Sequence, residues 1–228
     1  MCVNFLPPAK RQLAEHFQVI EPDEDWPGET WQGYAAPIVV DVGQGPQALL
    51  ASYGMVPRSR IPVGVRPYTT MNARAETVGE KRAYRGAWRV GQLCLVPMQA
   101  FFEPSYESGR PVRWRIGAAD GAPFAVAGLW RAWDEPDGTL SYSFTQLTIN
   151  ADAHPVMRRF HAPGDEKRSL VVVPRADYDA WLGCRNPEIA RALLQPCADD
   201  FLRCEPAPLP RRGARPADDL FGGQGDAG

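Results

Sequence analysis

The pattern of apolar and polar positions predicts a domain of many short strands with a few helices at its margins. Runs typical of strands occupy residues 36–42, 47–56, 93–96, 100–102, 112–116, 124–133, 141–149 and 170–173. Helical spacing or composition occupies residues 8–18, 71–85, 174–182 and 187–194. Pro136-Asp137-Gly138 indicates a hairpin turn. We therefore expect an α+β fold with a mainly antiparallel β core and peripheral helices.

Two segments interrupt this pattern. Residues 21–33 are acidic and rich in turn residues, which predicts a surface loop. From Glu205 onward the chain is rich in proline, arginine and glycine, a composition typical of disorder. We therefore expect one domain over residues 1–204 and a disordered tail over residues 205–228.

Composition and charge narrow the class of protein. The 228 residues are 44% hydrophobic and 23% charged, which is ordinary for a soluble globular chain. The net charge of −2 excludes a polycation, so contact with nucleic acid would require a local basic cleft. No apolar run reaches the ~18 residues of a membrane helix, and no secretory signal is evident. A cytoplasmic protein with no membrane partner is expected.

The five cysteines are odd in number and form no CxxC pair, which favours reduced thiols over a disulfide framework. Cys184, Cys197 and Cys204 could supply three metal ligands, but no nearby histidine completes a familiar zinc spacing. Ordinary buried or surface thiols are the preferred interpretation.

The first candidate for chemistry is Cys2, which is small enough for Met1 to be trimmed after synthesis. Trimming would leave an α-amine, which titrates near ~7.7–8.0, beside a thiol that titrates near ~8.5. The unprotonated amine could attack a carbonyl, and the thiol could then close a five-membered thiazolidine ring. The alternative is a small buried structural cysteine.

Residues 72–77 place an amide, a guanidinium and a carboxylate close together. Asn72 could orient a terminal amine by hydrogen bonding, and Arg74 could grip a phosphate in bidentate fashion. An exposed helix start with a charge pair accounts for the same residues equally well.

A second candidate group contains Glu103, which follows Phe101-Phe102 and precedes Pro104. In a cleft it could serve as a general acid–base, although a turn glutamate at a strand end has the same sequence. Of the three histidines, His16 lies on a predicted surface helix. His154 and His161 follow a strand end, where loops carry sites, although a lone histidine is more often structural.

Together these motifs resemble the SOS-response-associated peptidase (SRAP) family of abasic-site-processing proteins. The similarity covers about residues 1–185 and keeps the family's order. It rests on Met1-Cys2, Gly54-Met55-Val56-Pro57, residues 72–77, Cys94-Leu95-Val96-Pro97 with Phe102-Glu103, Phe144-Thr145 through His161, and Ala180-Trp181-Leu182. The resemblance implies a single barrel-like domain that acts on single-stranded DNA in the DNA damage (SOS) response. It also implies a monomer that works beside the bacterial nucleoid without a metal or organic cofactor.

The resemblance also implies roles for the candidate residues. Cys2 would form a thiazolidine crosslink with the ring-opened aldehyde of an abasic site. Glu103 would shuttle protons, and His161 would act on the sugar hydroxyl during ring opening and reversal. Asn72 would hold the Cys2 backbone or amine, and Arg74 would bind the phosphate beside the lesion.

Several positions depart from the family pattern. Val3-Asn4 stands where the family usually has Gly-Arg, and Pro104 replaces a tryptophan. Arg58-Ser59-Arg60 replaces an aromatic residue, so Arg58 and Arg60 become the candidate DNA contacts there. The segment after His161 reads Ala162-Pro163-Gly164 instead of x-Arg-Met-Pro. The chain is therefore expected to be a divergent member.

Two other functions remain open. An N-terminal-nucleophile hydrolase would use the Cys2 thiolate against an amide, an activity that could be limited to the removal of Met1. A non-catalytic module would simply bind single-stranded DNA. In the tail, Leu220-Phe221 after an acidic pair resembles the short peptides that dock on a bacterial sliding clamp, although a linker end explains it as well.

Overall fold

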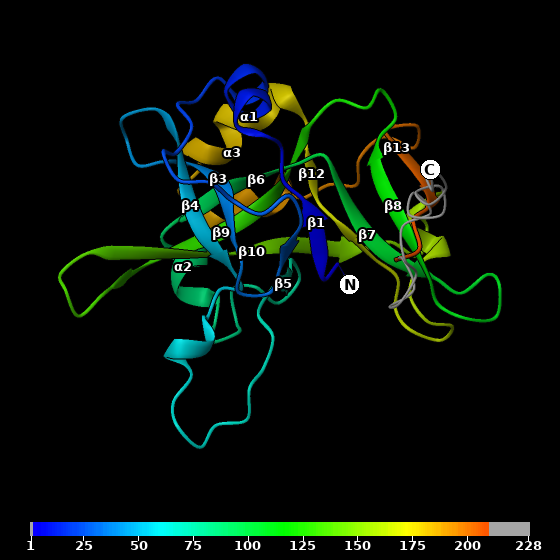
Figure 1. Cartoon of the computed structure of the whole chain (residues 1–228), viewed down its shortest axis with the longest axis horizontal. Helices are drawn as coiled ribbons and strands as arrows, with labels where there is room; N and C mark the ends of the chain where they lie inside the picture. The colour runs from blue at the N-terminus through cyan, green and yellow to red at the C-terminus, as the bar shows by residue number, and fades with distance from the viewer. Residues whose placement is uncertain (1, 210–228) are drawn as a thin grey trace, which may run out of the picture.

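The computed structural model describes residues 2–209, which form two β-sheets flanked by short helices (Figure 1). The smaller sheet has the strand order β13-β8-β7-β1-β2. The larger follows the order β11-β10-β4-β3-β6-β9-β12, and β5 pairs with β10. The smaller sheet comprises β1 (Asn4–Leu6), β2 (Thr30–Trp31), β7 (Ala100–Ser105), β8 (Val112–Ala118) and β13 (Leu202–Pro206). The larger comprises β3 (Ala35–Asp41), β4 (Pro46–Tyr53), β5 (Asn72–Arg74), β6 (Leu93–Met98), β9 (Phe124–Asp134), β10 (Leu140–Asn150), β11 (Arg168–Leu170) and β12 (Val172–Val173).

The larger sheet closes on itself as a five-stranded barrel. Strand β10 pairs antiparallel with β9 and parallel with β4, so that β4, β3, β6, β9 and β10 form a ring. Gly128 permits this closure, because a Cβ there would lie 2.7 Å from the Thr145 carbonyl oxygen and 2.8 Å from Cys94 Sγ. The expected barrel-like, mainly antiparallel β core is confirmed.

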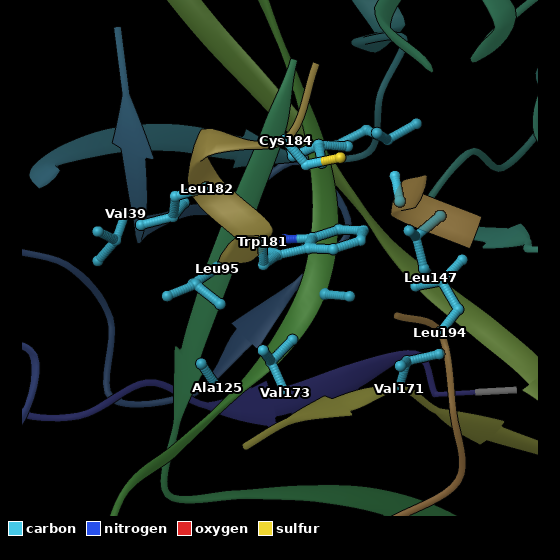
Figure 2. Close-up of a cluster of buried hydrophobic side chains, with 14 of the residues drawn as sticks. Val39, Leu95, Ala125, Leu147, Val171, Val173, Trp181, Leu182, Cys184 and Leu194 are labelled. Carbon is cyan, nitrogen blue, oxygen red and sulfur yellow. The ribbon is translucent and has the colours of Figure 1, made fainter. Parts of the chain in front are cut away.

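Helices cover one face of the barrel wall, as expected. They are α1 (Lys10–Phe17), α2 (Arg85–Arg89), α3 (Tyr178–Gly183) and α4 (Pro187–Ala192). Figure 2 shows the Trp181 indole in the middle of the cluster that they form with the barrel, beside Leu95 and Leu182. The indole Nε1 atom donates a hydrogen bond of 2.9 Å to the Cys94 carbonyl, which satisfies the buried donor.

The other face of the barrel wall packs on the smaller sheet through aromatic side chains. The ring of Phe5 on β1 lies edge-on to Tyr53, at 5.3 Å between centroids, and Tyr53 stacks on Phe144 at 5.2 Å. These contacts attach the strand that follows Cys2 directly to the barrel.

The helix expected over residues 71–85 was wrong. Asn72–Arg74 form β5, which pairs in parallel with β10, and turns follow until α2 begins at Arg85. Tertiary pairing overrides the helical composition here. The loop expected over residues 21–33 contains β2, and the three-residue strand β1 was not expected at all.

Strand β13 runs from Leu202 to Pro206 at the edge of the smaller sheet, so the boundary expected after residue 204 falls inside a strand. The clamp-docking candidates Leu220 and Phe221 lie outside the described residues. Within residues 2–209, no helix is long and apolar enough to cross a membrane.

Candidate active site

Cys2 is buried beside the barrel, with an exposed fraction of 1%. It precedes β1, which lies between β2 and β7 and is therefore hydrogen-bonded on both sides. The Cys2 carbonyl oxygen accepts hydrogen bonds from Asn72 Nδ2 at 2.6 Å and from the Tyr53 hydroxyl at 3.2 Å. Its thiol donates to the Asn4 carbonyl at 3.2 Å. The position of Cys2 is thus held by three hydrogen-bonding partners.

The supports of Cys2 belong to a buried polar network. The Tyr53 hydroxyl oxygen lies 2.9 Å from Gln146 Oε1, and the Tyr84 hydroxyl donates to the Asn72 carbonyl at 3.2 Å. A hydroxyl has one proton to donate. If the Gln146 side-chain amide is turned so that Nε2 faces the Tyr53 oxygen, the buried Nε2 atom donates to that oxygen and gains a partner. The Tyr53 proton can then be donated to the Cys2 carbonyl.

Burial and charge keep the Cys2 thiol protonated. Burial raises the pKa of this thiol well above its usual range, and the nearby charge of Glu103 raises it further. At neutral pH the sulfur is therefore a thiol rather than a thiolate, which makes it a weak nucleophile until a base removes its proton.

Glu103 and His161 meet beside Cys2. Glu103 lies on β7, with an exposed fraction of 3%. The backbone N–H of His161 donates to the Pro104 carbonyl at 3.1 Å, and Ser105 forms a β-bridge with Phe160. These contacts attach the histidine loop to the end of β7, so that His161 Nε2 lies 3.4 Å from Glu103 Oε2.

The backbone of His161 is strained. Its φ of 68° lies in the left-handed region, which costs a residue other than glycine of order 1–3 kcal/mol. The Lys167 Nζ atom holds this conformation by donating to the His161 carbonyl at 3.3 Å and to the Ala162 carbonyl at 3.0 Å. The loop is therefore built to present the imidazole to Glu103.

Arg74 and Glu76 form a second group of charges beyond β5. Arg74 is half exposed and pairs with Glu166 at 2.7 Å. Glu76 pairs with the buried Arg168, which also pairs with Glu166 at 2.7 Å. Hydrogen bonding by Arg168 lowers the pKa of Glu166, which therefore remains a carboxylate. Arg168 connects β11 to the segment after β5, and Arg74 is left at the surface.

The structure keeps Arg60 away from the Cys2 group. The 3-10 turn η1 (Arg58–Arg60) leads into an exposed loop, and Arg58 forms no ion pair within residues 2–209. Arg60 pairs with Glu135 at 2.7 Å and donates to the Asp134 carbonyl at 2.8 Å. Its guanidinium therefore binds the hairpin between β9 and β10.

His154 has a structural position. Its Nδ1 atom accepts hydrogen bonds from the backbone N–H groups of Val156 and Met157, at 3.2 and 3.3 Å. Its Nε2 atom lies 3.5 Å from Cys197 Sγ. It therefore caps the turn before η2 (Met157–Arg159), in the same loop that carries His161.

The three cysteines considered as metal ligands lie in separate surroundings. Cys184 Sγ donates to the Asn186 carbonyl, while Cys204 Sγ lies 3.4 Å from Arg159 Nη1. Across residues 2–209, no cluster of three or more histidine, cysteine or acidic side chains could hold a metal ion.

Sequence reasoning missed Tyr53 and Gln146. Both lie on strands expected from the apolar pattern, where a buried tyrosine or glutamine carries no distinctive local signal. Asn72, Glu103 and His161 were expected, and the structure places Asn72 and Glu103 beside Cys2, with His161 beside Glu103.

The family described as SOS response associated peptidase (SRAP) matches residues 1–208. The abasic site processing protein YoqW of Bacillus subtilis (strain 168) is 31% identical over 138 residues, which are 59% of this chain and 58% of that protein. YoaM, an abasic site processing protein of the same strain, is 32% identical over 138 residues, or 59% of this chain and 57% of its own. Each match therefore spans less than two thirds of the relative.

Solved structures share the fold. The crystal structure of a Bordetella bronchiseptica protein matches with a TM-score of 0.80 and 32% identity, over 91% of this chain and 100% of that one. A Bacteroides thetaiotaomicron protein matches with a TM-score of 0.69 and 19% identity, over 90% of this chain and 91% of its own. The second likeness concerns the fold alone.

Proposed function

The chain belongs to the SOS response associated peptidase (SRAP) family, and on this premise we propose that it crosslinks Cys2 covalently to abasic sites in single-stranded DNA. One observation carries the proposal. Asn72 and Tyr53 hold the Cys2 backbone, while the buried Glu103, with His161 beside it, lies close enough to affect the Cys2 thiol. An amine, a thiol and a proton-transferring pair are the groups that thiazolidine formation requires. The names of YoqW and YoaM point to the same kind of lesion.

The first step uses the amine of Cys2 after Met1 has been removed. The neutral amine attacks the aldehyde carbon of the ring-opened abasic sugar, and a C–N bond forms to give a carbinolamine. Proton transfer to the carbinolamine hydroxyl then allows water to leave, with formation of an imine. Glu103 would supply and recover this proton, a role in which general acid–base catalysis is typically worth ~10²–10⁴-fold.

The second step uses the thiol. The sulfur attacks the imine carbon, a C–S bond forms, and the thiol proton passes to the nitrogen, which closes the thiazolidine. The whole reaction releases one water molecule. Because the raised pKa keeps the Cys2 thiol protonated, we expect the amine to react first and the sulfur to follow when Glu103 accepts its proton.

The hydrolase alternative fits the site less well. An N-terminal cysteine hydrolase depends on a thiolate that attacks an amide carbonyl. Burial and the charge of Glu103 both raise the pKa of the Cys2 thiol, which opposes thiolate formation before substrate binds. Peptidase activity limited to the loss of Met1 remains compatible with the crosslinking proposal.

DNA recognition would come from the surface near β5. Arg74 is half exposed on β5, directly after Ala73 and close in sequence to Asn72, the residue that holds Cys2. A DNA phosphate there would exchange with the Glu166 carboxylate as the partner of the Arg74 guanidinium. Arg58, exposed at η1, remains a proposed secondary contact, whereas the ion pair with Glu135 makes Arg60 a weaker one.

The proposal is tested with a single-stranded oligonucleotide that carries one abasic site. The mature protein should give a product that survives denaturation, with a mass equal to protein plus DNA minus one water. Cys2→Ala should give no such product while it retains single-strand binding, and Cys94→Ala provides a control at another buried cysteine. Amide cleavage without a crosslink, or a thiazolidine product from Cys2→Ala, would contradict the proposal.

A further inference from the structure

A hollow of about 260 Å³ lies between α2 and β9 and is lined by two arginines. Its walls are Met55, Arg82, Ala83, Gly86, Ala87, Gln92 and Arg131. Figure 1 shows α2 beside the β9–β10 hairpin, which projects from the body of the barrel. No carboxylate is among these residues, so the wall of the hollow carries two positive charges and one amide donor.

The two guanidinium groups are available for an anion. Within residues 2–209, neither Arg82 nor Arg131 forms an ion pair or a side-chain hydrogen bond, and both are exposed. By contrast, Arg60, which also lies 5.4 Å from the centroid of the Trp133 ring, is neutralised by Glu135. Free arginines that converge on one hollow favour bidentate binding of an oxyanion such as phosphate.

Trp133 orients one of these arginines. The Arg131 guanidinium lies 3.9 Å from the centroid of the Trp133 ring, within the range of a cation–π contact. The indole is itself held, because its Nε1 atom donates to the Ser143 hydroxyl at 2.8 Å. A guanidinium held in this way loses less conformational entropy when it binds an anion.

The hollow adjoins the Cys2 site through chain neighbours. Met55 lies two residues after Tyr53, whose hydroxyl donates to the Cys2 carbonyl. Ala83 immediately precedes Tyr84, whose hydroxyl donates to the Asn72 carbonyl. Two buried tyrosines therefore connect the wall of the hollow to the groups that hold Cys2.

We infer that this hollow binds a backbone phosphate of the single strand whose lesion lies at Cys2. The inference rests on single-stranded DNA as the partner in the proposed function, and it adds a contact outside the reacting site. The phosphate contributes affinity without reading the sequence of bases. Binding should therefore depend on strand length, because a strand too short to reach the hollow gains nothing from it.

The test measures non-covalent binding, with Cys2→Ala as the background so that no crosslink interferes. Lesion-free oligonucleotides of about 4 to about 16 nucleotides cover the usual site sizes. Arg82→Gln with Arg131→Gln should reduce the magnitude of the salt slope for the longest strand by about 0.7, because the two arginines share one phosphate and each phosphate contact to a single strand contributes about 0.7. Both positions are exposed, so the variant is expected to fold.

Arg115→Gln is the matched control, because Arg115 lies on β8 in the smaller sheet and pairs with Glu205 at 3.6 Å. Its salt slope should equal that of the background. An unchanged slope in the double variant, or an equal loss at all strand lengths, would overturn the inference. Competition by inorganic phosphate at constant ionic strength that removes all the affinity due to Arg82 and Arg131 at every length would assign the hollow to free phosphate instead.

The two proposals fail separately. Absence of a crosslink from mature protein, together with a reduced salt slope in the double variant, would refute the proposed chemistry and retain the phosphate site. A normal crosslink with an unchanged slope would do the reverse.

Discussion

The Oε2 atom of Glu103 lies 3.4 Å from the Nε2 atom of His161, and both side chains are almost completely buried. Strand β7 supplies the first residue, and a loop attached to the end of that strand supplies the second. The site therefore contains two ionisable groups whose separation is set by backbone contacts. This arrangement leads to distinct expectations for the two residues.

Glu103→Gln should slow crosslink formation by ~10²–10⁴-fold, the usual worth of general acid–base catalysis. Glutamine keeps the shape of the side chain and removes its ability to exchange a proton. Single-turnover rates on a denaturing gel would measure the loss, with circular dichroism to verify folding. Glu107→Gln, which alters an exposed carboxylate paired with Arg159, should react at the parent rate. Equal rates for Glu103→Gln and the parent would remove Glu103 from the mechanism.

His161 should matter more for crosslink reversal than for DNA affinity. Asparagine is the suitable replacement, because it tolerates the left-handed backbone that His161 adopts, whereas alanine would add strain. The expected result for His161→Asn is slower release of a preformed crosslink, with a dissociation constant for lesion-free strands that changes less than twofold. Release at the parent rate would show that the imidazole takes no part in reversal.

Tyr53 and Asn72 should act together, because both donate to the Cys2 carbonyl oxygen. Tyr53→Phe keeps the ring packing against Phe5 and Phe144 and removes the contacts of the hydroxyl with Cys2 and Gln146. Loss of the hydrogen bond to the Cys2 carbonyl, at ~1 kcal/mol, corresponds to about a fivefold slower reaction. We expect Tyr53→Phe and Asn72→Ala to be non-additive in single-turnover rates, since each loss leaves the other donor to hold the same oxygen. Strict additivity would mean that they do not share this role.

Arg74 and Glu166 should have opposite effects on DNA binding. Arg74→Ala removes a phosphate contact and should lower the magnitude of the single-strand salt slope by about 0.7. Glu166→Gln removes the carboxylate that occupies Arg74 and should strengthen binding at low salt. Titrations over a series of salt concentrations distinguish the two. If both variants bind like the parent, the Arg74–Glu166 pair is purely structural.

His154 should make the fold sensitive to acid. Burial lowers the pKa of His154, and its Nδ1 atom must stay unprotonated to accept two backbone hydrogen bonds. The unfolded chain binds a proton near ~6.5 while the folded chain resists it, so stability is complete above that pH and is lost as pH falls through the folded pKa. His154→Asn keeps an acceptor for the turn without this titration. Its melting temperature should fall less between pH 7 and pH 5 than that of the parent.

The apolar pattern predicted the barrel strands well because each is long and buried on at least one face. It missed β1 because three residues carry no periodic signal, and it missed β13, which ends in Pro206 at a sheet edge. It assigned residues 71–85 to a helix because pairing between β5 and β10 is a long-range contact that local composition does not encode.

The residues of the candidate site were proposed from their chemistry, one position at a time. How these residues lie relative to one another could not be predicted. The contact between Glu103 and His161 depends on the backbone hydrogen bond from His161 to Pro104. The ion pair of Arg60 depends on Glu135, in a hairpin that is distant in the sequence. Tyr53 escaped notice because its partner, the Cys2 carbonyl, is a backbone group that any residue possesses.

The position of β1 imposes an order of events during synthesis. Among the described strands β1 is made first, yet its neighbours are β2 and, far later, β7, while Tyr53 and Asn72 are made in between. Cys2 is therefore accessible on the nascent chain and becomes enclosed only after residues 100–105 have been made. For the proposed chemistry, we expect an aminopeptidase to remove Met1 within that interval. A fusion partner placed before Cys2 would both block the amine and crowd the closing sheet, so a purification tag belongs at the other end of the chain.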